Sequence, residues 1–189
     1  MTDPARFTMV ALLVQAALGV AGWFGAVGGP SPVRFGARPF ASVAVGVGVG
    51  AALTALMRWL LARQPAWMEA LRRTVDEQLV PTVGRLGPGQ IALVSVAAGI
   101  GEELCFRGWL QPLVGPVVAS LAFGAAHVAG VRTLALGAWA TIMGGVLGAL
   151  VGPTGGIGAS MTAHTCYDLL AFQYLRRRAA GDAGRGVGW

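Results

Sequence analysis

The sequence contains no lysine and few charged residues of either sign. Charged side chains make up 12% of the 189 residues, whereas they make up roughly 25% of soluble globular proteins. Hydrophobic residues make up 55% of the chain. This composition excludes a soluble polar domain and a disordered basic tail, and it predicts an integral membrane protein.

Cysteine and histidine are also scarce, with two of each. Cys105 and Cys166 lie in apolar stretches and form no Cys-x-x-Cys pair, so we expect neither a disulfide framework nor a zinc knuckle. The basic residues are all arginines, and the formal net charge is +6. A basic balance can indicate nucleic-acid binding, but these arginines lie between apolar stretches. We therefore expect no nucleic-acid partner, and the sequence implies no cofactor.

The apolar stretches predict a single all-α domain over residues 1–189, a polytopic transmembrane helix bundle of about six spans. A spanning helix needs about 20 mostly apolar residues. The expected spans are residues 7–33, the stretch between Arg38 and Arg58 with an extension to Trp59–Leu61, and about residues 90–113, 117–130, 133–151 and 157–175.

Residues 62–88, between the second and third spans, have a different character. Here arginines and acids alternate with Trp67, Leu71 and Val75, a pattern typical of a helix that lies in the membrane interface. The fifth span, in contrast, carries small residues at four-residue spacing. Such a stripe favours close helix packing, and its members are Ala140, Gly144, Gly148 and Gly152.

The arginines predict the orientation, because cytoplasmic loops carry an excess of basic residues. With six spans, eleven arginines lie on one side of the membrane, and only Arg34 and Arg38 lie on the other. We therefore expect both termini and the interfacial segment 62–88 to be cytoplasmic. The expected location is the cytoplasmic (inner) membrane of a prokaryote.

Several ionisable residues lie inside the predicted spans, where each costs ~2.5–3.5 kcal/mol at a helix centre on insertion scales. Both histidines of the chain are among them. Residues of this kind are functional candidates by default, with ion pairing as the competing explanation. They are Glu102, Glu103, Arg107, His127, His164 and Asp168.

The depths of these residues predict that they meet. Gly115-Pro116 forms a tight turn, and Glu102 and His127 are equally far from it along the chain. In an antiparallel hairpin they lie side by side, ~19 Å below the turn at 1.5 Å per residue. Asp168 reaches a similar depth, ~21 Å below the next turn, and shares a helix face with His164 at i,i+4 spacing.

Chemistry suggests a role for each residue. Glu103 and Arg107 are spaced i,i+4 with the acid N-terminal to the base, the order that favours an ion pair. Glu102 has no such partner at i+4, so it is the better general base. His127 can share a water with Glu102, and His164 can donate a hydrogen bond to an oxyanion. The set predicts water-mediated hydrolysis of a peptide bond inside the membrane, with a peptide or membrane protein as substrate.

At these residues the sequence resembles the CAAX protease and bacteriocin-processing family (CPBP, also called Abi) of intramembrane glutamic endopeptidases. The family has three motifs on successive core helices: Glu-Glu-x-x-x-Arg, Phe-x-x-x-His and His-x-x-x-Asn/Asp. The resemblance covers a catalytic core of about residues 89–175. The corresponding motifs here are EELCFR (Glu102–Arg107), FGAAH (Phe123–His127) and HTCYD (His164–Asp168).

The resemblance implies that Glu102 and His127 activate water, while His164 and the residue at 168 stabilise the oxyanion. An ionised aspartate at that position would repel the oxyanion. Asp168 is therefore either protonated or orients His164 and favours its imidazolium form, and we favour orientation. Phe123 is expected to form a wall of the site.

Three alternatives remain open from the sequence. A zinc protease could use Glu102, His127 and His164 as ligands, although there is no His-Glu-x-x-His motif. A rhomboid-like serine protease could use Ser160. The third alternative is non-catalytic: a proton-coupled carrier, or an immunity or partner-binding membrane protein of the same family.

Overall fold

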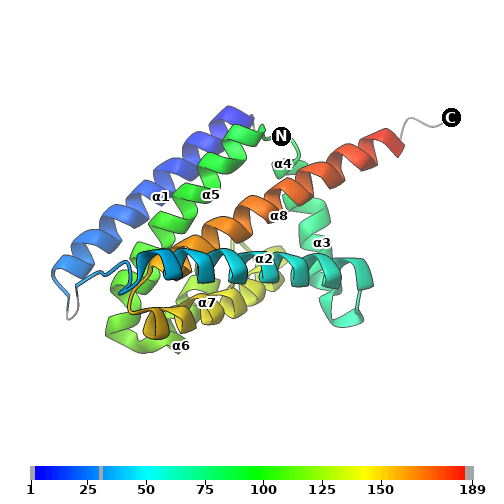
Figure 1. The fold of residues 1–189 in the computed structure, drawn as a ribbon. Helices are drawn as coiled ribbons and strands as arrows, with labels where there is room; N and C mark the ends of the chain where they lie inside the picture. The colour runs from blue at the N-terminus through cyan, green and yellow to red at the C-terminus, as the bar shows by residue number, and fades with distance from the viewer. Residues whose placement is uncertain (1–2, 30–31, 186–189) are drawn as a thin grey trace.

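The computed structural model describes residues 3–29 and 32–185, which form helices joined by short turns and loops, with no strand among them (Figure 1). Proline stands in the first turn of α1, α2 and α5, where its missing N–H costs no helical hydrogen bond. The long helices are α1 (Pro4–Val27), α2 (Pro39–Arg63), α5 (Pro88–Glu103), α6 (Gln111–Ala126), α7 (Leu134–Thr154) and α8 (Gly158–Arg185).

Four helical stretches in the described chain are long and apolar enough to cross a membrane, which makes this a multi-pass membrane protein. They are Pro4–Val27, Pro39–Arg63, Pro88–Ala126 and Val131–Thr154. The sixth expected span, in α8, is not among the four, because polar residues such as His164 and Asp168 lower its mean hydropathy.

The stretch Pro88–Ala126 is not one straight helix. A π-helix, η3 (Leu104–Leu110), joins α5 to α6, and Gly115 then breaks the helix at φ 82° and ψ 164°. Glycine adopts this backbone conformation without steric cost, and Pro116 starts the return arm. The predicted turn at Gly115-Pro116 is thus confirmed.

The predicted fourth span, 117–130, is wrong in its extent. Its helix ends at Ala126, so the return arm is only ~16 Å long, shorter than the ~30 Å hydrocarbon core of a bilayer. The hydroxyl of Thr133 accepts hydrogen bonds from the backbone N–H groups of Ala129 and Gly130. These bonds stabilise a turn where another helical turn was expected.

The two ends of the bundle differ in charge. Figure 1 shows the N-terminus, α3, α4 and the C-terminal part of α8 at one end. Arg178 on α8 pairs there with Asp76 at 2.8 Å. At the other end the loops before α2 and α8 meet, where the N–H of Ile157 donates to the carbonyl of Arg34 at 2.8 Å. The segments rich in arginine therefore share one end of the molecule.

Residues 66–86, which we call the covering segment, follow α2 and precede α5 in the chain, and they pack across the bundle. They form η1 (Ala66–Met68), α3 (Glu69–Thr74), the π-helix η2 (Val75–Leu79) and α4 (Val80–Val83). The helix expected here is present as a continuous helical run over residues 66–83 that contains a π turn, and its place in the membrane interface stays a prediction. Pro81 cannot donate to an i−4 carbonyl and clashes with it, which accounts for the wider π turn that precedes it.

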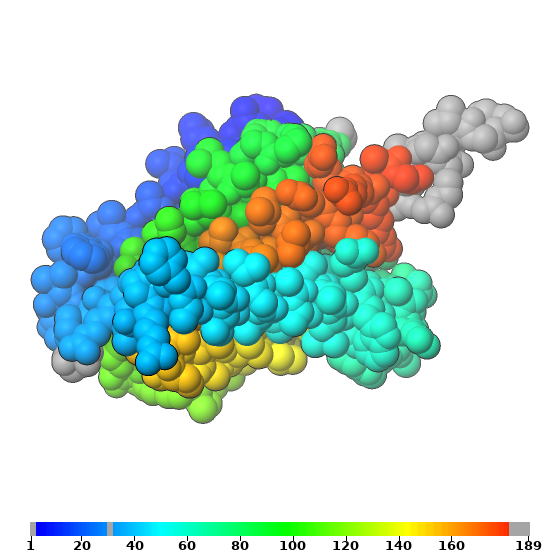
Figure 2. Space-filling model, in the orientation of Figure 1, coloured from blue at the N-terminus to red at the C-terminus, as the bar shows by residue number. Residues whose placement is uncertain are grey.

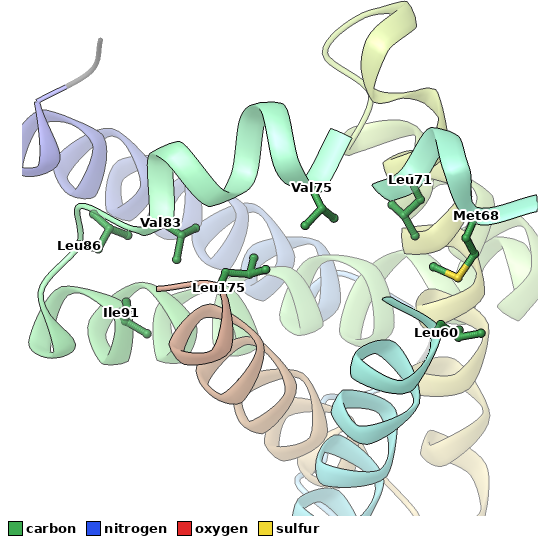
Figure 3. Packing of buried hydrophobic residues seen from close by; sticks show 8 residues of the cluster. All are labelled: Leu60, Met68, Leu71, Val75, Val83, Leu86, Ile91 and Leu175. Atoms are coloured by element: carbon green, nitrogen blue, oxygen red, sulfur yellow. The ribbon is translucent and has the colours of Figure 1, made fainter. Parts of the chain in front are cut away.

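The covering segment is amphipathic, as its sequence predicts. Its apolar side chains pack against α2, α5 and α8 (Figure 3). On its charged side, hydrogen bonds from Arg72 and Arg73 hold the pKa of Glu69 below its usual value. The buried cluster consists of Leu60, Met68, Leu71, Val75, Val83, Leu86, Ile91 and Leu175. Figure 2 shows this region closed over by side chains from α2, α8 and the covering segment.

Candidate active site

Two consecutive glutamates end α5, immediately before the π-helix η3. Successive residues of an α-helix point ~100° apart, so Glu102 and Glu103 meet different surroundings. π-helical turns are frequent at functional sites, and this one carries Arg107.

Glu103 is held on the inner side of the site. Its side chain is completely buried, and its Oε1 atom accepts hydrogen bonds from Arg107 Nη1 at 2.7 Å and from His164 Nδ1 at 2.9 Å. The predicted Glu103–Arg107 ion pair is confirmed.

Arg107 is itself fixed by two further contacts. Its Nη2 atom donates to the carbonyl oxygen of Gly144 at 3.1 Å, and its guanidinium lies 4.3 Å from the centre of the Phe123 ring. Gly144 belongs to the small-residue stripe of α7, of which Ala140, Gly144 and Gly148 are buried. The small side chains leave backbone carbonyls within reach of an arginine as well as allowing close packing.

Glu102 lines the cavity, and one of its two carboxylate oxygens is held by a hydrogen bond. Its Oε1 atom accepts a 2.6 Å hydrogen bond from Gln15 Nε2 on α1. Its Oε2 atom lies 3.8 Å from His127 Nε2 and 3.9 Å from His164 Nε2. Within the described residues Glu102 Oε2 has no hydrogen-bond partner. The side-by-side arrangement of Glu102 and His127 expected from the hairpin is confirmed.

The orientation of His127 fixes its tautomer. Its Nδ1 atom lies 2.8 Å from the carbonyl oxygen of Phe123, which can only accept. In the neutral ring Nδ1 therefore carries the hydrogen, and Nε2 presents a lone pair towards Glu102. The Phe123 ring packs against both imidazoles, with centroids 4.7 Å from His127 and 5.7 Å from His164.

Asp168 lies one turn beyond His164 on α8. Its Oδ2 atom is 3.6 Å from His164 Nε2, so carboxylate oxygens lie near both ring nitrogens of His164. All seven residues singled out from the sequence, from Glu102 to Asp168, are thus brought together by three separate parts of the chain.

A cavity of about 280 Å³ opens beside this cluster. The polar residues Glu102, His127, His164 and Asp168 form one wall, and most of the remaining lining is apolar. The cavity extends to the covering segment, where Leu71, Val75 and Leu79 line it. The candidate site is therefore a polar patch in an otherwise apolar chamber.

Sequence reasoning missed two residues around this chamber. One is Gln15, which contacts Glu102 although it lies outside the expected catalytic core of residues 89–175; it is the one carboxamide in α1. The other is Tyr167, whose hydroxyl accepts a 2.9 Å hydrogen bond from Trp139 Nε1 and lines the cavity.

Two of the alternatives left open by the sequence, the serine protease and the zinc protease, depend on Ser160 and on a metal site. Ser160 is completely buried, and its hydroxyl donates to the carbonyl of Ile157 at 2.9 Å. Across the described part of the chain, no group of three or more His, Cys, Asp or Glu side chains is arranged to hold a metal ion.

The comparison with protein families matches residues 85–170, the segment that carries the three motifs. The matching family is Rce1-like, described as type II CAAX prenyl endopeptidase Rce1-like. No curated protein and no solved structure matches the chain. Residues 85–170 are therefore similar to the Rce1-like family of CAAX-type endopeptidases.

Proposed function

We propose that the protein is an intramembrane endopeptidase that hydrolyses a peptide bond of a membrane-associated protein or peptide. One observation carries the proposal. An oxygen of Glu102 without a protein hydrogen bond faces the Nε2 atoms of two histidines, at the wall of an apolar cavity. The match of residues 85–170 to the Rce1-like family supports it.

The first step is the activation of water by Glu102 and His127. The 3.8 Å between Glu102 Oε2 and His127 Nε2 is too long for a direct hydrogen bond, and one water molecule can bridge the two atoms. Both atoms accept, so both hydrogens of that water have a partner. Glu102 then takes a proton as the water oxygen bonds to the carbonyl carbon.

The second step is the stabilisation of the oxyanion. Attack moves the carbonyl electron pair onto oxygen, and His164, as an imidazolium, donates from Nε2 to that oxygen. Asp168, 3.6 Å from the same nitrogen, orients the ring. The intermediate collapses when the C–N bond breaks, and the proton taken from water is delivered to the departing amine.

Three residues act through His164. Glu103 holds its Nδ1 atom, Arg107 neutralises Glu103, and Phe123 packs against the ring. Their role in the proposal is to fix the imidazole, because catalytic groups must be held within fractions of an ångström.

The topology completes the proposal. We place the end that carries the termini and the covering segment in the cytoplasm, by the distribution of arginine. The chain then passes from side to side six times, and residues 127–133 complete the short fourth pass. The covering segment supports this arrangement, since its Thr74 hydroxyl donates to the carbonyl of Arg132 at 2.8 Å. Substrate enters from the cytoplasmic half, beside the covering segment.

The test is cleavage of peptides by protein purified in detergent. Two pools of internally quenched peptides are compared, identical except that one carries an S-farnesyl group on a cysteine near the C-terminus. Wild type should cleave members of at least one pool, and Glu102→Ala should cleave neither. Equal cleavage by the two proteins would sink the proposal, and the difference between the pools shows whether a prenyl group is required.

Two controls separate the alternatives. Ser160→Ala should retain activity, because its hydroxyl is bonded to the backbone away from the cavity lining. Activity that is abolished by a chelator and restored by zinc would instead establish the zinc protease. A folded wild type that cleaves nothing would favour the partner-binding alternative.

A further inference from the structure

The first helix reaches into the candidate active site from outside the segment that matches the family. Gln15 lies on α1, and its Nε2 atom donates to Glu102 Oε1 at 2.6 Å. We propose that Gln15 is a positioning residue, which fixes the carboxylate of Glu102 so that Oε2 faces the two histidines. The inference rests on the proposed function, in which Glu102 acts on water.

The packing of α1 against α5 fixes where Gln15 stands. A Cβ atom at Gly101 would clash with the backbone carbonyl of Gln15, so the two helix backbones touch one residue before Glu102. A second contact holds the start of α1, where Gln90 Nε2 donates to Thr8 Oγ1 at 2.9 Å. Figure 1 shows the two helices side by side along this length. The amide of Gln15 is therefore presented by a backbone that is itself held in register.

The geometry shows why this contact matters for orientation. Within the described residues Glu102 has no arginine partner like the one that holds Glu103, and its hydrogen bond is the one from Gln15. A hydrogen bond to an ionised acceptor is roughly twice as strong as a neutral one. Without it the carboxylate is free to rotate, and Oε2 no longer has a fixed place between the imidazoles.

An amide suits this position better than a cation would. Gln15 donates to the carboxylate without adding charge, whereas an arginine would favour the ionised form of Glu102 and weaken its ability to take a proton from water. The chain thus places a neutral donor on the acting glutamate and a charged donor on the structural one.

Three variants test the inference. Gln15→Met keeps the length of the side chain and removes the donor. Gln15→Glu keeps length and shape, but its carboxyl donates only while protonated, and two adjacent carboxyls share one proton over a limited pH range. Val14→Met is the matched control, since Val14 is 51% exposed on the outer face of the same helix.

Kinetics on a peptide cleaved by wild type give the first readout. We expect Gln15→Met to lower kcat by about 10- to 100-fold with KM nearly unchanged, as for a misplaced catalytic group. Gln15→Glu should regain activity at acidic pH and lose it as the pH rises, and Val14→Met should match wild type. Unchanged kcat in Gln15→Met, or an equal loss in Gln15→Glu at all pH values, would overturn the inference.

Infrared spectroscopy gives a readout that does not need turnover. The difference spectrum between each protein and its Glu102→Gln counterpart isolates the carboxylate band of Glu102. That band should shift in Gln15→Met and stay in place in Val14→Met. If wild type cleaves no peptide, the proposed function fails, but the Glu102 band still tests the contact with Gln15. A shift of the band in Gln15→Met supports the positioning contact, and no shift rejects it.

Discussion

Glu102 and Glu103 are adjacent in the sequence and both are buried, but they differ in their hydrogen-bond donors and in their access to the cavity. On the inner side, Glu103 is completely buried and accepts hydrogen bonds from Arg107 and His164. On the cavity side, Glu102 has one oxygen bonded to Gln15 and the other facing two imidazoles. Within the described residues the Oε2 atom of each carboxylate has no hydrogen-bond partner, but Glu103 Oε1 accepts from an arginine and a histidine, whereas Glu102 Oε1 accepts from one neutral amide.

Under the proposed function, this difference lets one helix hold a structural acid and a reactive one a single residue apart. A buried charge is tolerable when it is paired and hydrogen-bonded, which describes Glu103. A base must instead keep a lone pair available for the proton that it removes, which describes Glu102. Each of the following experiments perturbs one side and asks whether the other responds.

The largest expected effect on catalysis comes from the cavity side. Glu102→Gln should lower kcat by about 10³-fold, because it removes the group that takes the proton from water. The melting temperature in detergent should change little, since the amide can still accept from Gln15. A large loss of thermal stability in this variant would mean that Glu102 is as structural as Glu103.

The largest expected effect on stability comes from the inner side. Arg107→Met should destabilise the protein by about 3–5 kcal/mol, because it leaves the Glu103 carboxylate buried without its cation. The matched control is the double variant Glu103→Gln/Arg107→Met, which removes both charges and should recover most of the loss in a thermal unfolding assay. Equal destabilisation of the single and double variants would contradict the ion-pair interpretation.

A smaller effect is expected at Asp168, whose Oδ2 atom lies 3.6 Å from His164 Nε2. Asp168→Leu removes the contact and should lower kcat by about 10-fold, as expected for a misoriented group. Asp168→Asn should keep kcat within about 3-fold of wild type, because the amide preserves the shape and can still contact the imidazole. A greater loss in Asp168→Asn than in Asp168→Leu would show that the role ascribed to orientation is wrong.

The smallest effect is expected far from the site, at the partly exposed pair of Arg178 and Asp76. Exposed or half-exposed ion pairs contribute about 0–1 kcal/mol. Asp76→Asn should therefore lower the free energy of unfolding by less than about 1 kcal/mol and leave kcat unchanged. An effect as large as that of Arg107→Met would erase the contrast between buried and exposed pairs.

Local features of the sequence predicted much of this arrangement. The i,i+4 spacing of Glu103 and Arg107 was sufficient for their ion pair, and Gly115-Pro116 was sufficient for the hairpin that brings His127 to Glu102. In both cases the determining residues lie close together in the chain, so helix geometry alone fixes their relation.

The features that could not be predicted depend on distant or competing contacts. The contact of Gln15 with Glu102 requires the rotation and crossing of two helices, which composition and periodicity do not specify. The end of α6 at Ala126 depends on the Thr133 hydroxyl, which competes for backbone N–H groups in a stretch that is otherwise apolar. For the contact with Glu102, the available signal in the sequence was Gln15 itself, the one carboxamide in α1.

The contacts around Glu102 also set an order of assembly. Its amide donor lies on α1, and His164 lies on α8, the last of the described helices. During synthesis the N-terminal parts emerge and insert first, so α1 and α5 are made before α8. A chain interrupted before α8 lacks His164, and under the proposed function it cannot yet stabilise an oxyanion.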